Sequence, residues 1–323
     1  MTEQTVTDKI VQAIRNSQSV VLISHISPDG DTCACGLALL HALEKLGKSV
    51  TLCCENIPSG NLQTMAGCNR YTDRVPQEKF DLAIAVDCGD LGRLGIFAET
   101  FERARVSINI DHHGTNTRFG TYYLVQTVSA TCELIYGVIR ALDAVQPCMD
   151  ATIAQLLYTG MVTDTGGFGF SSVTPQTFRI AAELLEYGFA AHLVYQRFMH
   201  AIAPNAFALR NRVLNQAKFF ENGQIAMVVM TQDDFDATHT TSENTEGIIH
   251  MLRDVDGVRV AVSIAQVKEM KYKVSFRTDD SVNAAEIALI FGGGGHKNAA
   301  GCRLSGYLED VKEKLLKACK DCL

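Results

Sequence analysis

Three short apolar runs in this chain each end directly in acidic or imidazole side chains. The runs are rich in β-branched residues, which is typical of buried strands, and they occupy residues 20–23, 82–86 and 106–110. A helical pattern separates the first run from a further apolar run at 49–54, and this strand–helix–strand order predicts a mainly parallel sheet flanked by helices. Parallel strands bring their carboxyl ends to one edge, where α/β proteins bind ligands. The repeated pattern therefore predicts an α/β fold with a charged site along that edge.

The polar residues after the first run allow two interpretations. His25, Asp29 and Asp31 follow it within a turn that contains proline and glycine, and a helix begins directly afterwards. Either aspartate could cap that helix by accepting hydrogen bonds from its first amides. A cap accounts for one aspartate but leaves the second aspartate and the histidine unexplained, so capping and metal binding both stay open on this stretch alone. The next two runs favour metal binding, because Asp87 follows one of them and the triplet 111–113 follows the other.

Asp164 is a further candidate ligand. It follows a helical pattern at 151–161, and the carboxyl end of a helix carries partial negative charge, so an aspartate there needs a compensating cation unless it is a solvated loop residue. The candidate ligands are then His25, Asp29, Asp31, Asp87, His112 and Asp164. Two imidazoles and four carboxylates are too many, and too rich in oxygen, for one tetrahedral zinc ion. They suit a pair of octahedral ions, with Mn²⁺ favoured over Mg²⁺ by the imidazoles.

A two-metal site indicates a reaction class. Two ions about 3.5–4 Å apart can activate water and hold both sides of a phosphorus centre, which predicts hydrolysis of a phosphate ester or anhydride. Asp87, on a middle strand, is the candidate for a bridging carboxylate. The loop Gly-x-x-x-x-Gly-Lys-[Ser/Thr] is absent from the sequence, which disfavours nucleoside triphosphate hydrolysis of that kind.

The pattern changes after the candidate ligands. Residues 175–219 read as helical with a break at 203–205, which makes this region the most plausible connector. We therefore expect a catalytic domain at 1–190, a helical connector at 191–221 and a smaller α/β domain at 222–323.

A run of four glycines is the main signal in the last domain. That domain begins with strand patterns, at 224–230, 258–267 and 272–277. The glycines occupy 292–295 and precede His296, and we do not expect such a run inside a helix or a strand. Glycine backbone exposes N–H groups that can cradle an anion, although a flexible hinge is the alternative. The attached histidine and the basic Arg277 favour phosphate binding.

Composition limits the partners. A net charge of −7 argues against binding long duplexes, which requires a broad basic surface, but allows a short anionic substrate. The eleven cysteines are scattered and mostly lie in apolar segments, which suits buried thiols in a reducing compartment. The sequence shows neither a signal-peptide pattern nor an apolar run of membrane-spanning length, so we expect a cytoplasmic protein without a membrane partner.

The triplet Asp111-His112-His113 resembles the motif of the DHH phosphoesterase family. Other motifs of that family also appear, in order, as His25-x-x-Pro28-Asp29-Gly30-Asp31, Asp87-Cys88-Gly89 and Val162-Thr163-Asp164-Thr165-Gly166. Residues 275–277 and 292–296 resemble the DHHA1 domain that accompanies it. One departure is Ala34-Cys35, where the family usually has a Gly-Ser pair. Both replacements are small, so we expect the chemistry to persist while helix packing near the ligands differs.

The resemblance implies two Mn²⁺ ions, with Mg²⁺ or Co²⁺ as substitutes, in a cleft between the two domains. It assigns the first ion to His25, Asp29 and Asp87, and the second to Asp31, Asp87, His112 and Asp164. The expected catalytic residues are Asp87 and His113. His113 either polarises the phosphate or protonates the leaving oxygen. The resemblance also assigns the grip on the substrate's phosphate to Arg277, Gly294, Gly295 and His296.

Among the members of this family, the chain is similar to the stand-alone oligoribonuclease, or nanoRNase, type. It lacks the transmembrane segments of the cyclic-dinucleotide phosphodiesterases and the OB domain of RecJ-type exonucleases, whereas family II pyrophosphatases lack its glycine–histidine motif. The implied substrates are short RNAs, linear dinucleotides such as pApA or pGpG, and 3′-phosphoadenosine 5′-phosphate. One alternative is a protein that acts mainly as a phosphatase of 3′-phosphoadenosine 5′-phosphate. The other is a catalytically silent module that binds a dinucleotide. The resemblance is also compatible with a homodimer.

Overall fold

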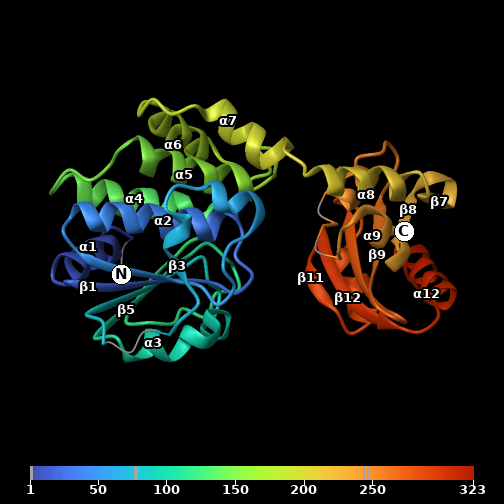
Figure 1. The fold of residues 1–323 in the computed structure, drawn as a ribbon, viewed down its shortest axis with the longest axis horizontal. Helices are drawn as coiled ribbons and strands as arrows, with labels where there is room; N and C mark the ends of the chain where they lie inside the picture. Colours follow the sequence, from blue (N-terminus) through green and yellow to red (C-terminus); the bar gives the residue numbers. More distant parts are fainter. Residues whose placement is uncertain (1–2, 76–78, 243, 246) are drawn as a thin grey trace. The chain divides into compact units, whose positions relative to one another are not determined.

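The computed structural model describes residues 3–75, 79–242, 244–245 and 247–323, and the chain divides into two compact units. The units are Met1–Ala201 and Ile202–Leu323, and the division lies inside the predicted connector at 191–221. Figure 1 shows both units, each built around one sheet.

The first unit alternates helices and strands along the chain (Figure 1). Its elements are α1 (Glu3–Arg15), β1 (Ser19–Ser24), α2 (Gly30–Lys45), β2 (Ser49–Cys53), η1 (Gly60–Thr64), η2 (Cys68–Arg70), β3 (Tyr71–Thr72), β4 (Leu82–Val86), η3 (Leu91–Phe97), α3 (Ala98–Arg103), β5 (Val106–Asp111), β6 (Tyr122–Val125), α4 (Thr131–Asp143), α5 (Ala151–Asp164), α6 (Pro175–Leu185), α7 (Ala191–Tyr195) and the π-helical turn η4 (Gln196–His200). Its six strands pair in parallel in the order β3-β2-β1-β4-β5-β6, which confirms the predicted parallel sheet.

Both faces of this sheet are buried. Along β1, Leu22 packs against the core under α2, α4 and α5, while its neighbour Val21 packs on the opposite face with Phe97 and Phe101. Figure 1 shows α2, α4 and α5 over one face and α3 over the other. Because successive residues of a strand point to opposite faces, a sheet that is covered on both sides needs apolar residues at every position. This explains why the strands read as continuous apolar runs.

The register of the sheet aligns the candidate site. Ser24, the last residue of β1, pairs with Val86 of β4, and Val86 pairs with Ile110 of β5. The next residues along the chain, beginning with His25 and Asp87, therefore leave the sheet at one level of its carboxyl edge.

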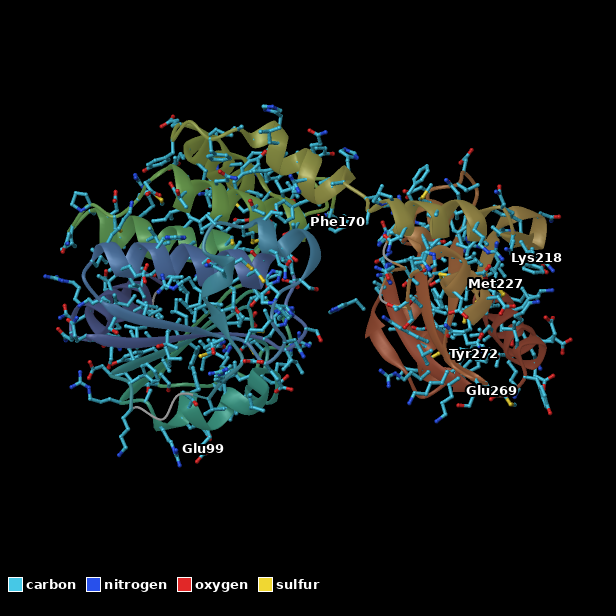
Figure 2. The ribbon with its side chains drawn as sticks, viewed as in Figure 1. Glu99, Phe170, Lys218, Met227, Glu269 and Tyr272 are labelled. Atoms are coloured by element: carbon cyan, nitrogen blue, oxygen red, sulfur yellow. The ribbon has the colours of Figure 1, made fainter. Side chains whose placement is uncertain are left out.

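The second unit contains a mixed sheet. Its elements are α8 (Pro204–Leu214), β7 (Lys218–Phe220), η5 (Glu221–Gly223), β8 (Ile225–Met230), α9 (Gln232–Thr238), α10 (Ile248–Arg253), β9 (Val260–Lys268), β10 (Lys271–Thr278), α11 (Ala284–Ile290), β11 (Gly294–His296), β12 (Ala299–Ser305) and α12 (Leu308–Asp321). The strand order is β11-β12-β10-β9-β8-β7, and in this sheet only β8 and β9 pair in parallel among the described residues. Met227 and Tyr272, labelled in Figure 2, belong to the core that includes residues of α11 and α12. Leu209 of α8 and Leu252 of α10 belong to the core on the other side of the sheet.

Two expectations for this half of the chain are wrong. The helical pattern expected to reach Phe219 ends at Leu214, and β7 follows. The glycine run is also not excluded from strands, because Gly294 and Gly295 form β11 with His296. Gly295 has φ +149, and a Cβ there would lie 2.5 Å from the Cα of Ala300, so only glycine lets the two strands approach this closely.

The cysteines agree with expectation. All eleven cysteines are unpaired, and all except Cys322 are buried, which confirms the predicted thiols. Across the described ranges, no helix combines the length and the apolar character that crossing a bilayer requires.

Gly160 allows α5 to lie against α2 and α4 beneath the candidate site. A Cβ at this position would overlap the Cys132 sulfur and lie 2.6 Å from Oδ1 of Asp31. We therefore expect Gly160→Ala to lower the free energy of unfolding by about 1–3 kcal/mol, as overpacking of a core does, measured by urea denaturation. Gly137→Ala is the matched control, because nothing lies within 4 Å of its added Cβ in α4 and the helix should gain stability. Equal stability of both variants would contradict this account of the packing.

Candidate metal centre

The six candidate ligands come together at the carboxyl edge of the first sheet. Among their ligand atoms, two groups have all members within 4.8 Å of one another, and these groups are His25, Asp29 and Asp87, and Asp31, His112 and Asp164. Those are the residues that the resemblance assigns to two ions, apart from the sharing of Asp87. Which ions they bind stays a prediction.

Asp87 lies between the two groups. Its Oδ2 is 3.5 Å from Nε2 of His25, and its Oδ1 is 3.6 Å from Nε2 of His112. The residue is 2 % exposed and has φ +56, in the left-handed region that Asp tolerates better than most residues. Its N–H donates to the carbonyl of Ile110 at 2.9 Å. This turn directs one carboxylate oxygen toward each group, which is the arrangement that a bridging ligand requires.

Asp29 is both a helix cap and a candidate ligand. Its Oδ1 accepts hydrogen bonds from the amides of Asp31 and Thr32, each at 3.1 Å, at the start of α2. Its Oδ2 remains directed to Nε2 of His25, 3.6 Å away. The two interpretations of this aspartate are therefore compatible, because each uses a different oxygen.

Asp31 is held by the first turn of α4. Its Oδ2 accepts a hydrogen bond from the amide of Thr131 at 2.6 Å, and its Oδ1 accepts one from the amide of Cys132 at 3.1 Å. The Thr131 hydroxyl donates to Oδ1 of Asp87 at 2.8 Å. Thr131 was not among the candidate site residues, because a threonine at a helix start is common and carries no sign of its distant partner.

The carboxylates are crowded and lack enough positive charge. Burial, together with the negative charges of Asp87 and Asp164, holds the pKa of Asp31 well above its usual range. Burial and the charge of Asp87 also raise the pKa of Asp164 to about 7, despite the opposing effect of His112. Four carboxylates with two imidazoles form a set of oxygen-rich donors whose charge two divalent cations would balance, so the residues fit the predicted metal pair.

The imidazoles show the same imbalance. Burial disfavours their charged form, but hydrogen bonds and charges from Asp29 and Asp87 outweigh it and raise the pKa of His25 to about 10. Burial likewise opposes the charge of His112, yet the charges of Asp164, Asp87 and Asp31 raise its pKa to about 9. Without a metal, these histidines hold protons at neutral pH that a metal ion must displace.

His113 is oriented by a chain of hydrogen bonds that the sequence did not reveal. Its Nδ1 lies 2.7 Å from Oδ1 of Asp111, and the Asn116 amide donates to Oδ2 of Asp111 at 2.6 Å. The hydrogen bond that His113 donates to Asp111 outweighs burial and raises the pKa of His113. The sequence identified Asp111 as part of the triplet. Its hydrogen bond with His113 depends on the bend of the chain after β5. Asn116 had no recognisable signal.

The predicted phosphate-binding residues form a separate group on the second sheet. Arg277 of β10 and His296 of β11 both pair with Ala299 of the strand between them. Phe276 and Ala300, one position along, are buried in the core with α11 and α12. Because neighbouring residues of a strand face opposite ways, the alternation places Arg277 and His296 on the face away from that core. Gly294 and Gly295 are exposed beside them.

Comparisons with known proteins cover both units. Residues 19–161 match the DHH family, N-terminal domain, and residues 222–323 match the DHHA1 domain. The bifunctional oligoribonuclease and PAP phosphatase NrnA of Thermus thermophilus is 33% identical over 308 residues, which cover 94% of this chain and 89% of that protein. The protein of the same name from Bacillus subtilis is 24% identical, over 95% of this chain and 96% of that protein. The crystal structure of an exopolyphosphatase-related protein from Bacteroides fragilis superposes with a TM-score of 0.91 at 25% identity, over 98% of this chain and 96% of that chain.

Metal binding to this site should release protons. Because His25 and His112 hold protons at pH 7 and Asp164 is partly protonated there, Mn²⁺ must displace them to reach the ligand atoms. We expect Mn²⁺ titrated into chelator-treated protein at pH 7 to give different calorimetric enthalpies in two buffers of different ionisation enthalpy. The affinity should fall as the pH is lowered from 8 to 6. Identical enthalpies in both buffers would contradict the predicted protonation of the metal-free site.

Proposed function

The chain belongs to the DHH family of phosphoesterases, and on that basis we propose that it is a Mn²⁺-dependent hydrolase of short oligoribonucleotides and of 3′-phosphoadenosine 5′-phosphate. The observation that carries the proposal is the position of Asp87, with one oxygen toward each of two ligand groups. Relatives that align along nearly the whole chain are named as bifunctional oligoribonucleases and PAP phosphatases, which supports the substrate class.

The residues of the first unit divide the work. When bound, two divalent ions would place positive charge against the phosphate oxygens and lower the pKa of the attacking water. His25, Asp29 and Asp87 would hold one ion, and Asp31, Asp87, His112 and Asp164 the other. Thr131 keeps Asp31 and Asp87 in place through its amide and its hydroxyl, so the ligands are oriented before the substrate arrives.

His113 is the proposed proton donor. Its Nδ1 is engaged by Asp111, so Nε2 is the nitrogen available to the substrate. The hydrogen bond to Asp111 raises the pKa of His113, which favours the protonated ring, and the side chain is 38% exposed. A protonated Nε2 can donate a hydrogen bond to a phosphate oxygen and transfer its proton to the leaving oxygen. Before the transfer Asp111 stabilises the imidazolium, and Asn116 fixes the carboxylate of Asp111.

The second unit supplies the proposed phosphate grip. Arg277 and His296 share one face of the sheet at the same register position, with the exposed backbone of Gly294 and Gly295 beside them. A guanidinium, an imidazole and backbone amides are the groups that bind phosphate oxygens in proteins. The silent-module alternative predicts the loss of metal ligands, whereas all six are present and grouped.

The order of the two activities can be tested with one panel. We expect Mn²⁺-loaded protein to turn over pApA, pGpG and RNAs of about two to five nucleotides faster than a long single strand, because a net charge of −7 disfavours binding of a long polyanion. Parallel assays with 3′-phosphoadenosine 5′-phosphate measure the second activity, and a preference for it would make the phosphatase the main function. Chelator should abolish all turnover, and Mn²⁺ should restore it. Substrate binding without turnover in the presence of Mn²⁺ would favour the silent module.

Arg277→Ala tests the phosphate grip. Loss of a charged hydrogen bond to phosphate should raise KM for short RNA by about 10- to 100-fold, with a smaller effect on kcat. Lys273→Ala is the matched control, because Lys273 is exposed on the same strand and face, four residue pairs from Arg277. An unchanged KM for Arg277→Ala, or an equal increase for both variants, would contradict the proposed contact.

A further inference from the structure

Arg93 lies beside the candidate metal centre and is not one of the six candidate ligands. It belongs to η3, the turn that follows Asp87 after β4. The side chain of Asp90 accepts a hydrogen bond from the Arg93 amide at 3.2 Å, and the Arg93 carbonyl accepts one from the amide of Ile26 at 2.9 Å. The backbone of Arg93 is therefore fixed to the residue directly after His25.

The guanidinium of Arg93 lies against His25 but cannot form a hydrogen bond with it. Nη2 of Arg93 is 3.0 Å from Nδ1 of His25, and the same Nδ1 is 2.8 Å from the carbonyl oxygen of Ile26. A carbonyl only accepts, so Nδ1 carries a hydrogen in this arrangement, and an arginine N–H cannot donate to it. This assignment also leaves Nε2 of His25 facing Asp29 and Asp87 as a ligand atom.

Arg93 also lacks an acidic partner. Arg103 and Arg212 have carboxylate partners, at 2.6 Å from Glu99 and 2.7 Å from Asp234 respectively. Within the part of the chain that the structure describes, no aspartate or glutamate forms an ion pair with Arg93, whose side chain is exposed. A guanidinium held beside a ligand histidine without an acceptor has free donors for an anion.

We propose that Arg93 is a substrate-binding residue that donates hydrogen bonds to an oxygen of the scissile phosphate on the His25 side of the site. This inference rests on the proposed phosphoesterase function. Once the four carboxylates are neutralised, Arg93 gives the site a net positive charge that attracts an anionic substrate. The planar fork of donors suits phosphate oxygens, and its stabilisation grows as negative charge develops in the transition state. This contact comes from the first unit, independently of Arg277.

The competing explanation is that Arg93 only positions His25. In that case its removal would weaken Mn²⁺ binding, and saturating Mn²⁺ would restore normal affinity for phosphate compounds. A direct contact predicts the opposite pattern, in which Mn²⁺ affinity is preserved and phosphate affinity is lost.

The experiment compares Arg93→Ala and Arg93→Lys with the natural protein by calorimetry. Mn²⁺ is titrated first, and then AMP is titrated into Mn²⁺-saturated protein, with adenosine as the uncharged probe. We expect unchanged Mn²⁺ affinity, AMP affinity about 10- to 100-fold weaker for Arg93→Ala, and partial recovery with Lys, which keeps the charge but not the fork. Adenosine binding should not change. Arg103→Ala is the matched control, because it removes one exposed arginine of the same unit at a distance in sequence from the ligands.

Turnover measurements distinguish a failure of this inference from a failure of the proposed function. For whichever phosphate ester the natural protein hydrolyses, we expect kcat/KM of Arg93→Ala at saturating Mn²⁺ to fall about 100-fold, with normal activity for Arg103→Ala. Unchanged AMP affinity, or a loss that excess Mn²⁺ repairs, would overturn the direct contact. If the natural protein hydrolyses neither short RNA nor the bisphosphate, the proposed function fails, while the AMP titrations still decide whether Arg93 binds phosphate.

Discussion

Uncompensated negative charge at one edge of a buried sheet governs the organisation of the first unit. Asp31 and Asp87 are almost completely buried, and Asp29 and Asp164 lie close to them, with the imidazoles of His25 and His112 among the four carboxylates. Removing carboxylates from water is costly unless they are paired or bound to cations. The fold meets part of this cost with backbone amides, at the start of α2 for Asp29 and at the start of α4 for Asp31. Divalent cations would meet the remainder.

Residues that orient the site differ in burial from residues that are proposed to contact a substrate. Groups that orient the ligands or His113, such as Thr131 and Asp111, are buried and form short hydrogen bonds within the unit. Groups proposed to contact a substrate, such as His113 and Arg93, are partly or largely exposed. The core beneath them is closely packed, as the lack of space for a Cβ at Gly160 shows, so the ligand positions depend on how α2, α4 and α5 pack. The site is therefore as rigid as the helix layer that covers the sheet.

Much of this arrangement could be predicted from the sequence, because the apolar runs indicate the strands and the acidic residues at their ends indicate the site. Apolar runs with acidic ends identified β1, β4 and β5 and placed His25, Asp87 and His112 at one edge. What failed depended on long-range pairing. The short β6 lacks a strong local signal and pairs with β5, and Gly295 enters a strand only because β12 lies against it. Thr131 and Asn116 acquire their roles from partners that only the fold brings near.

The left-handed backbone of Asp87 has a consequence for how such a site can be lost. At φ +56 the chain accepts Asp, Asn or Gly with little strain, whereas most other side chains would disturb the turn itself. The backbone conformation at this position therefore favours Asp, Asn or Gly, whereas metal binding requires the carboxylate of Asp. Asn keeps the backbone conformation but removes the charge. A single exchange of that kind would preserve the end of β4, the packing around it and the second unit. A protein of this fold can therefore lose its metal site through one substitution, stay folded, and continue as a protein that only binds its ligand.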